Sequence, residues 1–154
     1  MYCRTSSAGE RHAVRVAADA NVLLSAILGG RPRLILEDSQ VQEIFTTENT
    51  IAEVREYAVV LAKKRELPAD ILLLAVASLP VTVVNQPAYE RSLSEARGRI
   101  GKRDPDDVEI LALAMQLKIP LWSNDNDFED AGVQRYTTKD LLRELGLLRE
   151  GRPH

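Results

Sequence analysis

The chain has 154 residues, of which 45% are hydrophobic and 28% are charged, and its formal net charge is −3. This length and composition predict one globular domain that buries about 68–70% of its unfolded surface without disulfides. The longest apolar run, residues 71–77, is far shorter than the roughly 18 residues of a membrane span, so we expect no membrane segment. Cys3 is the only cysteine, which excludes an intrachain disulfide and favours the cytoplasm.

Polar residues at both ends of the chain predict tails that pack little against a core. Residues 1–12 contain Arg and Ser but lack the apolar segment of a secretory signal. We therefore expect a flexible N-terminal tail over 1–12, a single domain over 13–148 and a C-terminal tail over 149–154.

Short β-branched segments alternate along the chain with helical patterns. In chain order, strands are expected at 14–19, 43–47, 81–84, 120–125 and 133–138. Helices are expected at 21–28, 49–65, 69–78, 87–98, 105–118 and 138–146. This alternation predicts a three-layer α/β/α fold with a central parallel sheet of four to five strands.

Three acids are crowded at the start of the helix expected at 105–118. Asp104 is placed to act as its N-cap, and Pro105 suits the first helical position. Asp106 and Asp107 then lie where the helix dipole favours carboxylates. Helix initiation alone therefore accounts for these acids, and the rest of the sequence must decide whether one of them also has a chemical role.

Four acids from separate segments are expected at one edge of the sheet. Asp19 ends the first strand, and Asp125 follows the short strand that begins at residue 120. Asp107 lies in the first turn of the helix that precedes this strand, and Glu53 is near the start of the helix after 43–47. Ligands of open parallel sheets bind at the carboxyl ends of the strands. Capping or solvation explains each acid singly, whereas the four together favour one site. Carboxylates without His or Cys suit Mg²⁺ or Mn²⁺.

A basic stretch spans residues 97–103, directly before these acids. Its basic residues are Arg97, Arg99, Lys102 and Arg103. A solvated helix end explains such a stretch. The alternative is contact with a nucleic-acid backbone, which a chain of net charge −3 would have to attract through a local basic patch. Arg31 and Arg33, after the first helix, are further candidates for such contacts.

Three segments of the chain resemble successive motifs of the PIN domain family, metal-dependent nucleases that include the VapC-type toxins of toxin–antitoxin pairs. The segments are "ADANVLLSAIL", "TIAEVREYA" and "DPDDVEILALAMQLKIPLWSNDNDF". The resemblance covers about residues 14–145 and implies that the four family acids are Asp19, Glu53, Asp107 and Asp125.

The resemblance also implies supporting residues around these acids. Asn21 and Ser123 match positions that support the acids by hydrogen bonding, and Ser123 stands where Thr is commoner. Asp127 is either an outer-shell acid or the cap of the turn before Phe128, and we favour the cap.

The activity implied by the resemblance is hydrolysis of an RNA phosphodiester that leaves a 5′-phosphate, with Mg²⁺ or Mn²⁺ as the cofactor. Asp19, Asp107 and Asp125 would hold the metal. Glu53 would hold a second ion or position the water, and the number of ions stays open. The expected partners are the RNA substrate, an antitoxin protein and a second copy of the chain as a homodimer. The alternative is a PIN-like module that binds protein and has little or no nuclease activity.

Other enzyme classes lack the residues that they need. The chain contains no G-x-S-x-G, P-loop or G-x-G-x-x-G motif. His12 and His154 lie at the two ends, which leaves zinc hydrolysis and His-based acid–base chemistry without ligands or bases. A phosphoaspartyl hydrolase would need a second Asp where this chain has Asn21.

Overall fold

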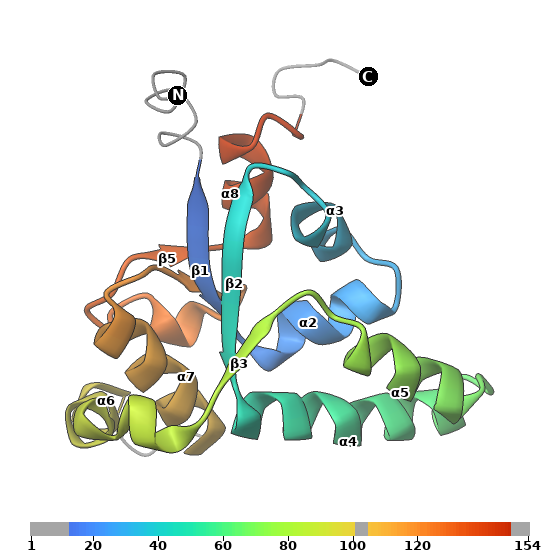
Figure 1. The fold of residues 1–154 in the computed structure, drawn as a ribbon, viewed down its shortest axis with the longest axis horizontal. Coiled ribbons are helices and arrows are strands. Elements are labelled where there is room, and N and C mark those ends of the chain that lie inside the picture. Colours follow the sequence, from blue (N-terminus) through green and yellow to red (C-terminus); the bar gives the residue numbers. More distant parts are fainter. Residues whose placement is uncertain (1–12, 101–104, 149–154) are drawn as a thin grey trace, which may run out of the picture.

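A computed structural model describes residues 13–100 and 105–148. In this part of the chain a five-stranded sheet has the order β3-β2-β1-β4-β5, and every neighbouring pair of strands is parallel (Figure 1). The expected three-layer α/β/α architecture is therefore confirmed, with five strands. The tails expected at 1–12 and 149–154 lie outside the described residues.

The strands agree with the sequence in position but not in length. Their bounds are β1 Val14–Ala18, β2 Val41–Thr47, β3 Thr82–Val84, β4 Leu121–Trp122 and β5 Arg135–Tyr136. β4 is much shorter than the segment expected at 120–125. The Ser123 N–H still donates to the Tyr136 carbonyl of β5 at 3.0 Å, but the side chains of Ser123 and Asn124 accept bonds from backbone N–H groups outside the sheet. The Ser123 hydroxyl accepts a hydrogen bond from the Asp125 N–H at 3.0 Å, and the Asn124 side chain accepts one from the Thr138 N–H at 2.7 Å.

Helices fill the connections between the strands. The α-helices are α2 Ala20–Ile27, α3 Pro32–Leu36, α4 Glu48–Lys64, α5 Ala69–Ala77, α6 Leu93–Ile100, α7 Pro105–Leu117 and α8 Thr138–Glu144, and the 3₁₀ turns are η1 Gln86–Ala88, η2 Glu90–Ser92 and η3 Asn126–Phe128. As expected, Pro105 begins α7. The side chain of Thr137 caps α8. None of the helices in the described residues combines the length and apolar character of a membrane span.

Two helical segments differ from the expectation. α3 was not predicted; it begins at Pro32 and is anchored by the buried side chain of Ile35. The single helix expected at 87–98 is instead η1, η2 and α6. The backbone of Tyr89, with φ −126°, interrupts helical geometry between the two turns, and its side chain is buried against α7, where its hydroxyl donates to Glu109.

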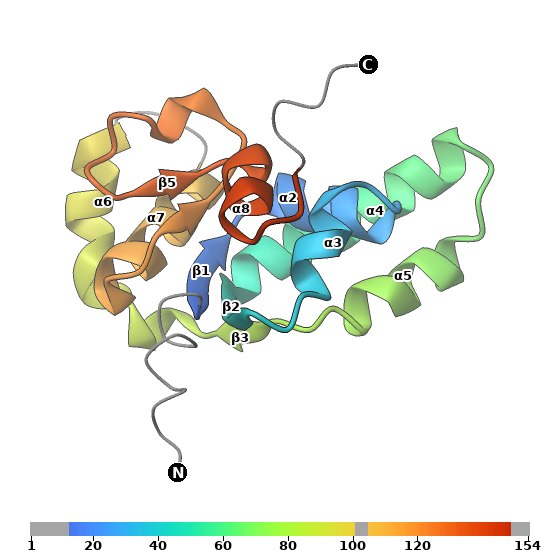
Figure 2. The same ribbon diagram turned by 90° about the horizontal axis from the view of Figure 1, so that it is seen from above.

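The sheet is buried on both faces, as expected for a parallel sheet between helical layers. Val16 and Ala18 pack into a core with α2, α3, α4, α5 and α8, whereas Ala17, Phe45 and Leu121 pack into a second core with α6 and α7. This alternation follows the two-residue period of a strand. In both views α6 and α7 lie on one side of the strands, and α4 and α5 lie on the other (Figures 1 and 2).

The direction of the chain through the sheet reverses between β1 and β4. From β1 the chain proceeds through β2 to β3, and it then returns to add β4 and β5 on the other side of β1. Here the Asp19 N–H donates to the Trp122 carbonyl at 3.2 Å, which aligns the carboxyl ends of the two strands. Such reversal points leave a crevice outside the strand ends, where doubly wound proteins bind ligands.

Candidate functional site

The four acids selected from the sequence line one small cavity at this reversal point. The cavity has a volume of about 30 Å³, and its lining includes Asp19, Glu53, Asp107 and Asp125. The acids come from the N-cap of α2, from α4, from α7 and from the loop after β4. A water needs about 10–15 Å³ of such space, so the cavity has room for about two waters, or for an ion whose remaining waters lie outside the cavity. The role of the four acids in chemistry stays a prediction.

Asp19 is the most enclosed of the acids, with 6% of its surface exposed. Its side chain caps α2 by accepting the Val22 N–H at 3.2 Å. The preceding carbonyl, that of Ala18, accepts the Thr46 hydroxyl at 2.9 Å, which fixes the end of β1. Burial raises the pKa of the Asp19 carboxyl, and the nearby Asp125 carboxylate adds to this effect, while Ser123 and the backbone N–H groups of Val22 and Asn21 lower it.

Ser123 connects two of the acids. Its side chain is fully buried. Its hydroxyl accepts the Asp125 N–H at 3.0 Å and also hydrogen-bonds to Asp19, where it favours the ionised carboxylate. Asn21 contributes its backbone N–H to Asp19, and its side chain is exposed and lines the cavity. These contacts position Asp19 and Asp125 relative to each other.

The cap proposed for Asp127 is wrong. Asp125 caps η3, and its Oδ1 accepts the Asp127 N–H at 2.9 Å. Asp127 itself lies inside η3, is exposed and is not among the residues that line the cavity. Asp125 therefore both caps η3 and lines the cavity, whereas the sequence analysis assigned the cap to Asp127 and the site to Asp125.

Threonines that the sequence analysis missed hold the α4 side of the cavity. The Thr47 hydroxyl caps α4, accepting the Thr50 N–H at 2.8 Å and donating to the Thr50 hydroxyl at 2.7 Å. Thr50 lines the cavity three residues before Glu53, a spacing that places both on one face of the helix. Glu53 is half-buried. A Thr-x-x-Thr pair at a strand-to-helix boundary is the signal that could have identified this support.

The α7 side of the cavity is formed by Asp107 and Ile110, which are three residues apart. Asp107 is half-buried and Ile110 is fully buried. The cap predicted for Asp104 and the side chain of Asp106 lie outside what the structure describes.

The donor chemistry of the cavity fits a hard divalent cation, because it offers carboxylate oxygens and no nitrogen or sulfur ligand. Across residues 13–100 and 105–148, however, no group of three or more His, Cys, Asp or Glu side chains is already arranged to hold a metal ion. Mg²⁺ is commonly bound through one or two carboxylates and several waters. The residues therefore fit an ion that keeps much of its hydration, without a preformed inner cage.

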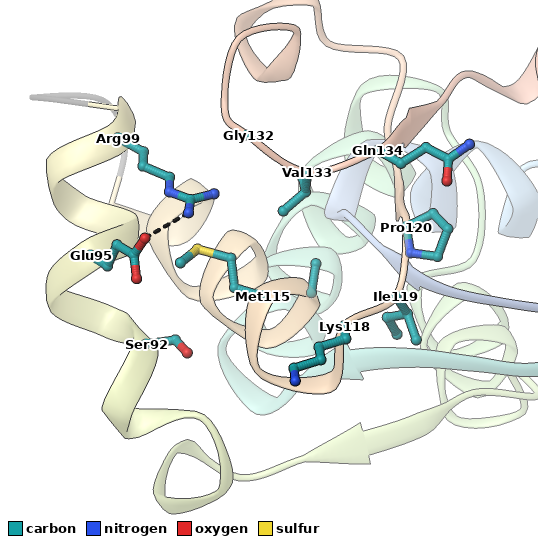
Figure 3. Close-up of a pocket in the computed structure, with 11 residues that line it drawn as sticks. Ser92, Glu95, Arg99, Met115, Lys118, Ile119, Pro120, Gly132, Val133 and Gln134 are labelled. Atoms are coloured by element: carbon teal, nitrogen blue, oxygen red, sulfur yellow. Dashed lines mark hydrogen bonds and ion pairs between the residues drawn. The ribbon is translucent and has the colours of Figure 1, made fainter.

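Arg97 and Arg99, the basic residues of the predicted stretch that the structure describes, do not line this cavity. Arg97 is exposed on α6, and Lys102 and Arg103 lie outside the described residues. Arg99 forms an ion pair with Glu95 at 2.6 Å and donates to the Ala131 carbonyl at 3.0 Å. These contacts belong to a second cavity, of about 400 Å³, beside the residues that precede β4 and β5 (Figure 3). Contact between the basic stretch and RNA stays a prediction.

Comparison with solved structures shows the same fold in proteins of low sequence identity. The matches include VapBC2 from Rickettsia felis bound to a promoter DNA fragment (TM-score 0.60, 17% identity, 80% of this chain and 98% of that chain covered). FitAcB from Neisseria gonorrhoeae gives a TM-score of 0.54 at 19% identity, covering 80% and 98% of the two chains. Mycobacterium tuberculosis VapC20, a sarcin–ricin loop cleaving toxin, gives 0.54 at 21%, covering 77% and 95%. No curated protein sequence matches the chain.

A sequence model of the PIN domain matches residues 17–146, which include the end of β1, all of β2 to β5 and all four acids of the cavity. The order of the strands, the acids at the reversal point and this match agree with one another. The chain therefore belongs to the PIN domain family.

Proposed function

We propose that the chain is an endoribonuclease that hydrolyses RNA phosphodiesters with the help of Mg²⁺ or Mn²⁺. The observation that carries this proposal is the cavity in which Asp19, Glu53, Asp107 and Asp125 meet at the carboxyl ends of β1 and β4. A small space walled by four carboxylates costs electrostatic free energy, and a divalent cation is the ligand that offsets this cost.

The four acids and Ser123 have three different tasks in this proposal. Asp19, Asp107 and Asp125 hold the cation, and Glu53 holds a second ion or orients the attacking water. When bound, the cation lowers the pKa of a coordinated water and stabilises negative charge on the phosphate under attack. Ser123 keeps Asp19 and Asp125 in register through its hydroxyl. Water adds to phosphorus, the bond to the 3′ oxygen breaks, and the products carry a 5′-phosphate and a 3′-hydroxyl.

The relatives support RNA as the substrate and a protein as a partner. VapC20 is described as cleaving the sarcin–ricin loop, and VapBC2 and FitAcB are two-component complexes. We therefore propose an antitoxin as a partner of this chain, and a homodimer as its assembly. Exposed apolar side chains on the outer surfaces of α4 and α5 are available for protein contacts; they include Tyr57, Val60, Ile71 and Leu74.

The test is Mn²⁺-dependent cleavage of end-labelled RNA, with EDTA as the blank. Asp19→Asn, Asp107→Asn and Asp125→Asn should each abolish cleavage, and the triple variant should be little worse than any single one, because losing one ligand displaces the same ion. Asp130→Asn is the matched control, since Asp130 is an exposed acid near Asp125 that does not line the cavity. Cleavage by this control should equal that of the wild type.

The alternative is a PIN-like module that binds protein and has little nuclease activity, which the exposed apolar residues of α4 and α5 would also favour. The two functions differ in their response to metal. Absence of cleavage by the wild type, together with no effect of Mn²⁺ on its melting temperature, would establish the binding module instead of the nuclease.

A further inference from the structure

A basic cavity lies at the same edge of the sheet as the carboxylate cavity. It has a volume of about 330 Å³ and is lined by Ser25, Arg31, Pro32, Asn124, Thr137, Thr138 and Lys139. This lining contains two cationic side chains, several hydroxyls and no acid. Its character is thus opposite to that of the neighbouring cavity, although both lie beyond the carboxyl ends of β4 and its neighbours.

Two chain segments make the basic cavity and the carboxylate cavity adjacent. Asn124 lines the first and Asp125, the next residue, lines the second. On α2, Asn21 lines the carboxylate cavity and Ser25, one helical turn later, lines the basic one. Residues four apart share a helix face, with Cβ atoms roughly 5–6 Å apart. A chain molecule that leaves one cavity can therefore enter the other directly.

The remaining wall comes from the starts of α3 and α8, which contact each other, and α3 also contacts α2 (Figure 2). Arg31 directly precedes α3 and Lys139 lies in the first turn of α8. Both side chains are exposed, and neither forms an ion pair within the described part of the chain. By contrast, Arg33, two residues after Arg31, pairs with Glu37 at 3.0 Å. The two cations of the cavity are therefore available to an outside anion.

We propose that this cavity is a phosphate-binding subsite that holds the backbone of a single RNA strand beside the carboxylate cavity. The inference rests on the proposed nuclease function and adds where the flanking phosphate binds. Arg31 and Lys139 supply charge, and the hydroxyl of Ser25 supplies a neutral donor. Contacts of this kind are independent of base sequence and fix the register of the strand. They also separate phosphate binding from the acids, which would repel the same phosphate in the absence of a cation.

The experiment measures binding of a short fluorescein-labelled single-stranded RNA by anisotropy, in EDTA so that no cleavage occurs, over a series of salt concentrations. For single strands the slope of log K against log salt is about −0.7 per phosphate neutralised. The variant Arg31→Gln/Lys139→Gln should bind more weakly, and its slope should be shallower by about 0.7 to 1.4, according to whether the two cations contact one phosphate or two. The single variants should each show part of this change.

The matched control is Lys63→Gln/Lys64→Gln, which removes the same charge from exposed positions at the end of α4 that line neither cavity. Its slope should equal that of the wild type. Equal slopes for the wild type and the Arg31/Lys139 variant, or no RNA binding by the wild type, would overturn the subsite.

Cleavage of the same RNA by the wild type with Mn²⁺ is read separately. If the wild type cleaves but the Arg31/Lys139 variant has the same salt slope as the wild type, the subsite is refuted and the nuclease function is retained. If the wild type never cleaves but the Arg31/Lys139 variant has a shallower salt slope than the wild type, the subsite is retained and the nuclease function is refuted.

Discussion

Replacing Asp19 by asparagine tests the electrostatics of the carboxylate cavity with little change of shape. Asparagine caps helices about as well as aspartate, so the bond from the Val22 N–H is retained. The charge, however, is removed. Because burial and the Asp125 carboxylate raise the pKa of Asp19, the folded protein carries the ionised form at a cost. Without metal, Asp19→Asn should therefore be more stable than the wild type at neutral pH.

The sign of this effect depends on pH. The raised pKa means that the folded state holds the Asp19 proton more tightly than the unfolded state. The wild type consequently loses unfolding free energy as the pH rises from the ordinary value of 3.8 through the raised pKa, and the loss is complete above it. Asp19→Asn lacks this titration. Its advantage over the wild type should grow over that window and then stay constant.

Loss of the α2 cap and binding of a metal ion each change the free energy of unfolding by an amount that general principles supply. Asp19→Ala loses the cap as well as the charge, so it should be about 1 kcal/mol less stable than Asp19→Asn. Metal at 100 times its dissociation constant should stabilise the wild type by about 2.7 kcal/mol. For a chain of 154 residues this corresponds to a rise in melting temperature of roughly 5–11 °C, and neither variant should show it.

The assays are urea unfolding in EDTA across the pH window and thermal melts with and without Mn²⁺. The reasoning fails if Asp19→Asn is less stable than the wild type at neutral pH in EDTA, or if their difference does not change with pH. An equal rise in melting temperature with Mn²⁺ for the variant and the wild type would show that Asp19 holds no metal.

Two further predictions concern the framework around the site. Gly132→Ala should lower the free energy of unfolding by about 1–3 kcal/mol in urea titrations, and by more than Gly29→Ala. Both glycines have positive φ, but a Cβ at Gly132 would lie 2.4 Å from the Arg99 guanidinium, whereas one at Gly29 meets nothing within 4 Å. Asp140→Asn should cost about 0.5–1 kcal/mol at neutral pH, because the Thr137 N–H holds the pKa of this partly exposed carboxyl low. That difference should disappear as the pH falls through the lowered pKa, and an unchanged difference in acid would exclude an ionic role for this cap.

The fold and the four acids could be predicted because their signals are local. The β-branched segment before Asp19 marks a strand by its composition, and the helix after Asp107 begins at a proline. Parallel strands place all their carboxyl ends at one edge, so acids at those ends gather whatever the detailed packing. The sequence could thus place acids of these segments at one edge without any knowledge of contacts, whereas the choice of Asp107 over Asp104 and Asp106 came from the resemblance to the PIN domain family.

The features that the sequence did not predict depend on contacts between distant residues. Asn124 accepts the N–H of Thr138, 14 residues away, which connects the loop after β4 to the start of α8. Tyr89 is buried against α7 through Glu109, 20 residues away, which breaks the helix expected there. Lys139 joins Arg31 in one cavity although more than a hundred residues separate them in the chain. Periodicity and capping rules describe neighbours along the chain, so they contain no information about such pairs.

The loop after β4 connects the two cavities through three consecutive side chains. Ser123 is buried and hydrogen-bonds to Asp19, Asn124 holds the first residue of α8, and Asp125 lines the carboxylate cavity and caps η3. Because each of these side chains is bound to a different element, the loop cannot shift one contact without straining the others. Asp125 and the start of α8, which carries Lys139, are therefore held at a fixed separation. Under the proposed function, an RNA strand with one phosphate bound between Arg31 and Lys139 has its neighbouring phosphodiester directed at the acids. The loop that positions Asp125 therefore also helps to orient the substrate.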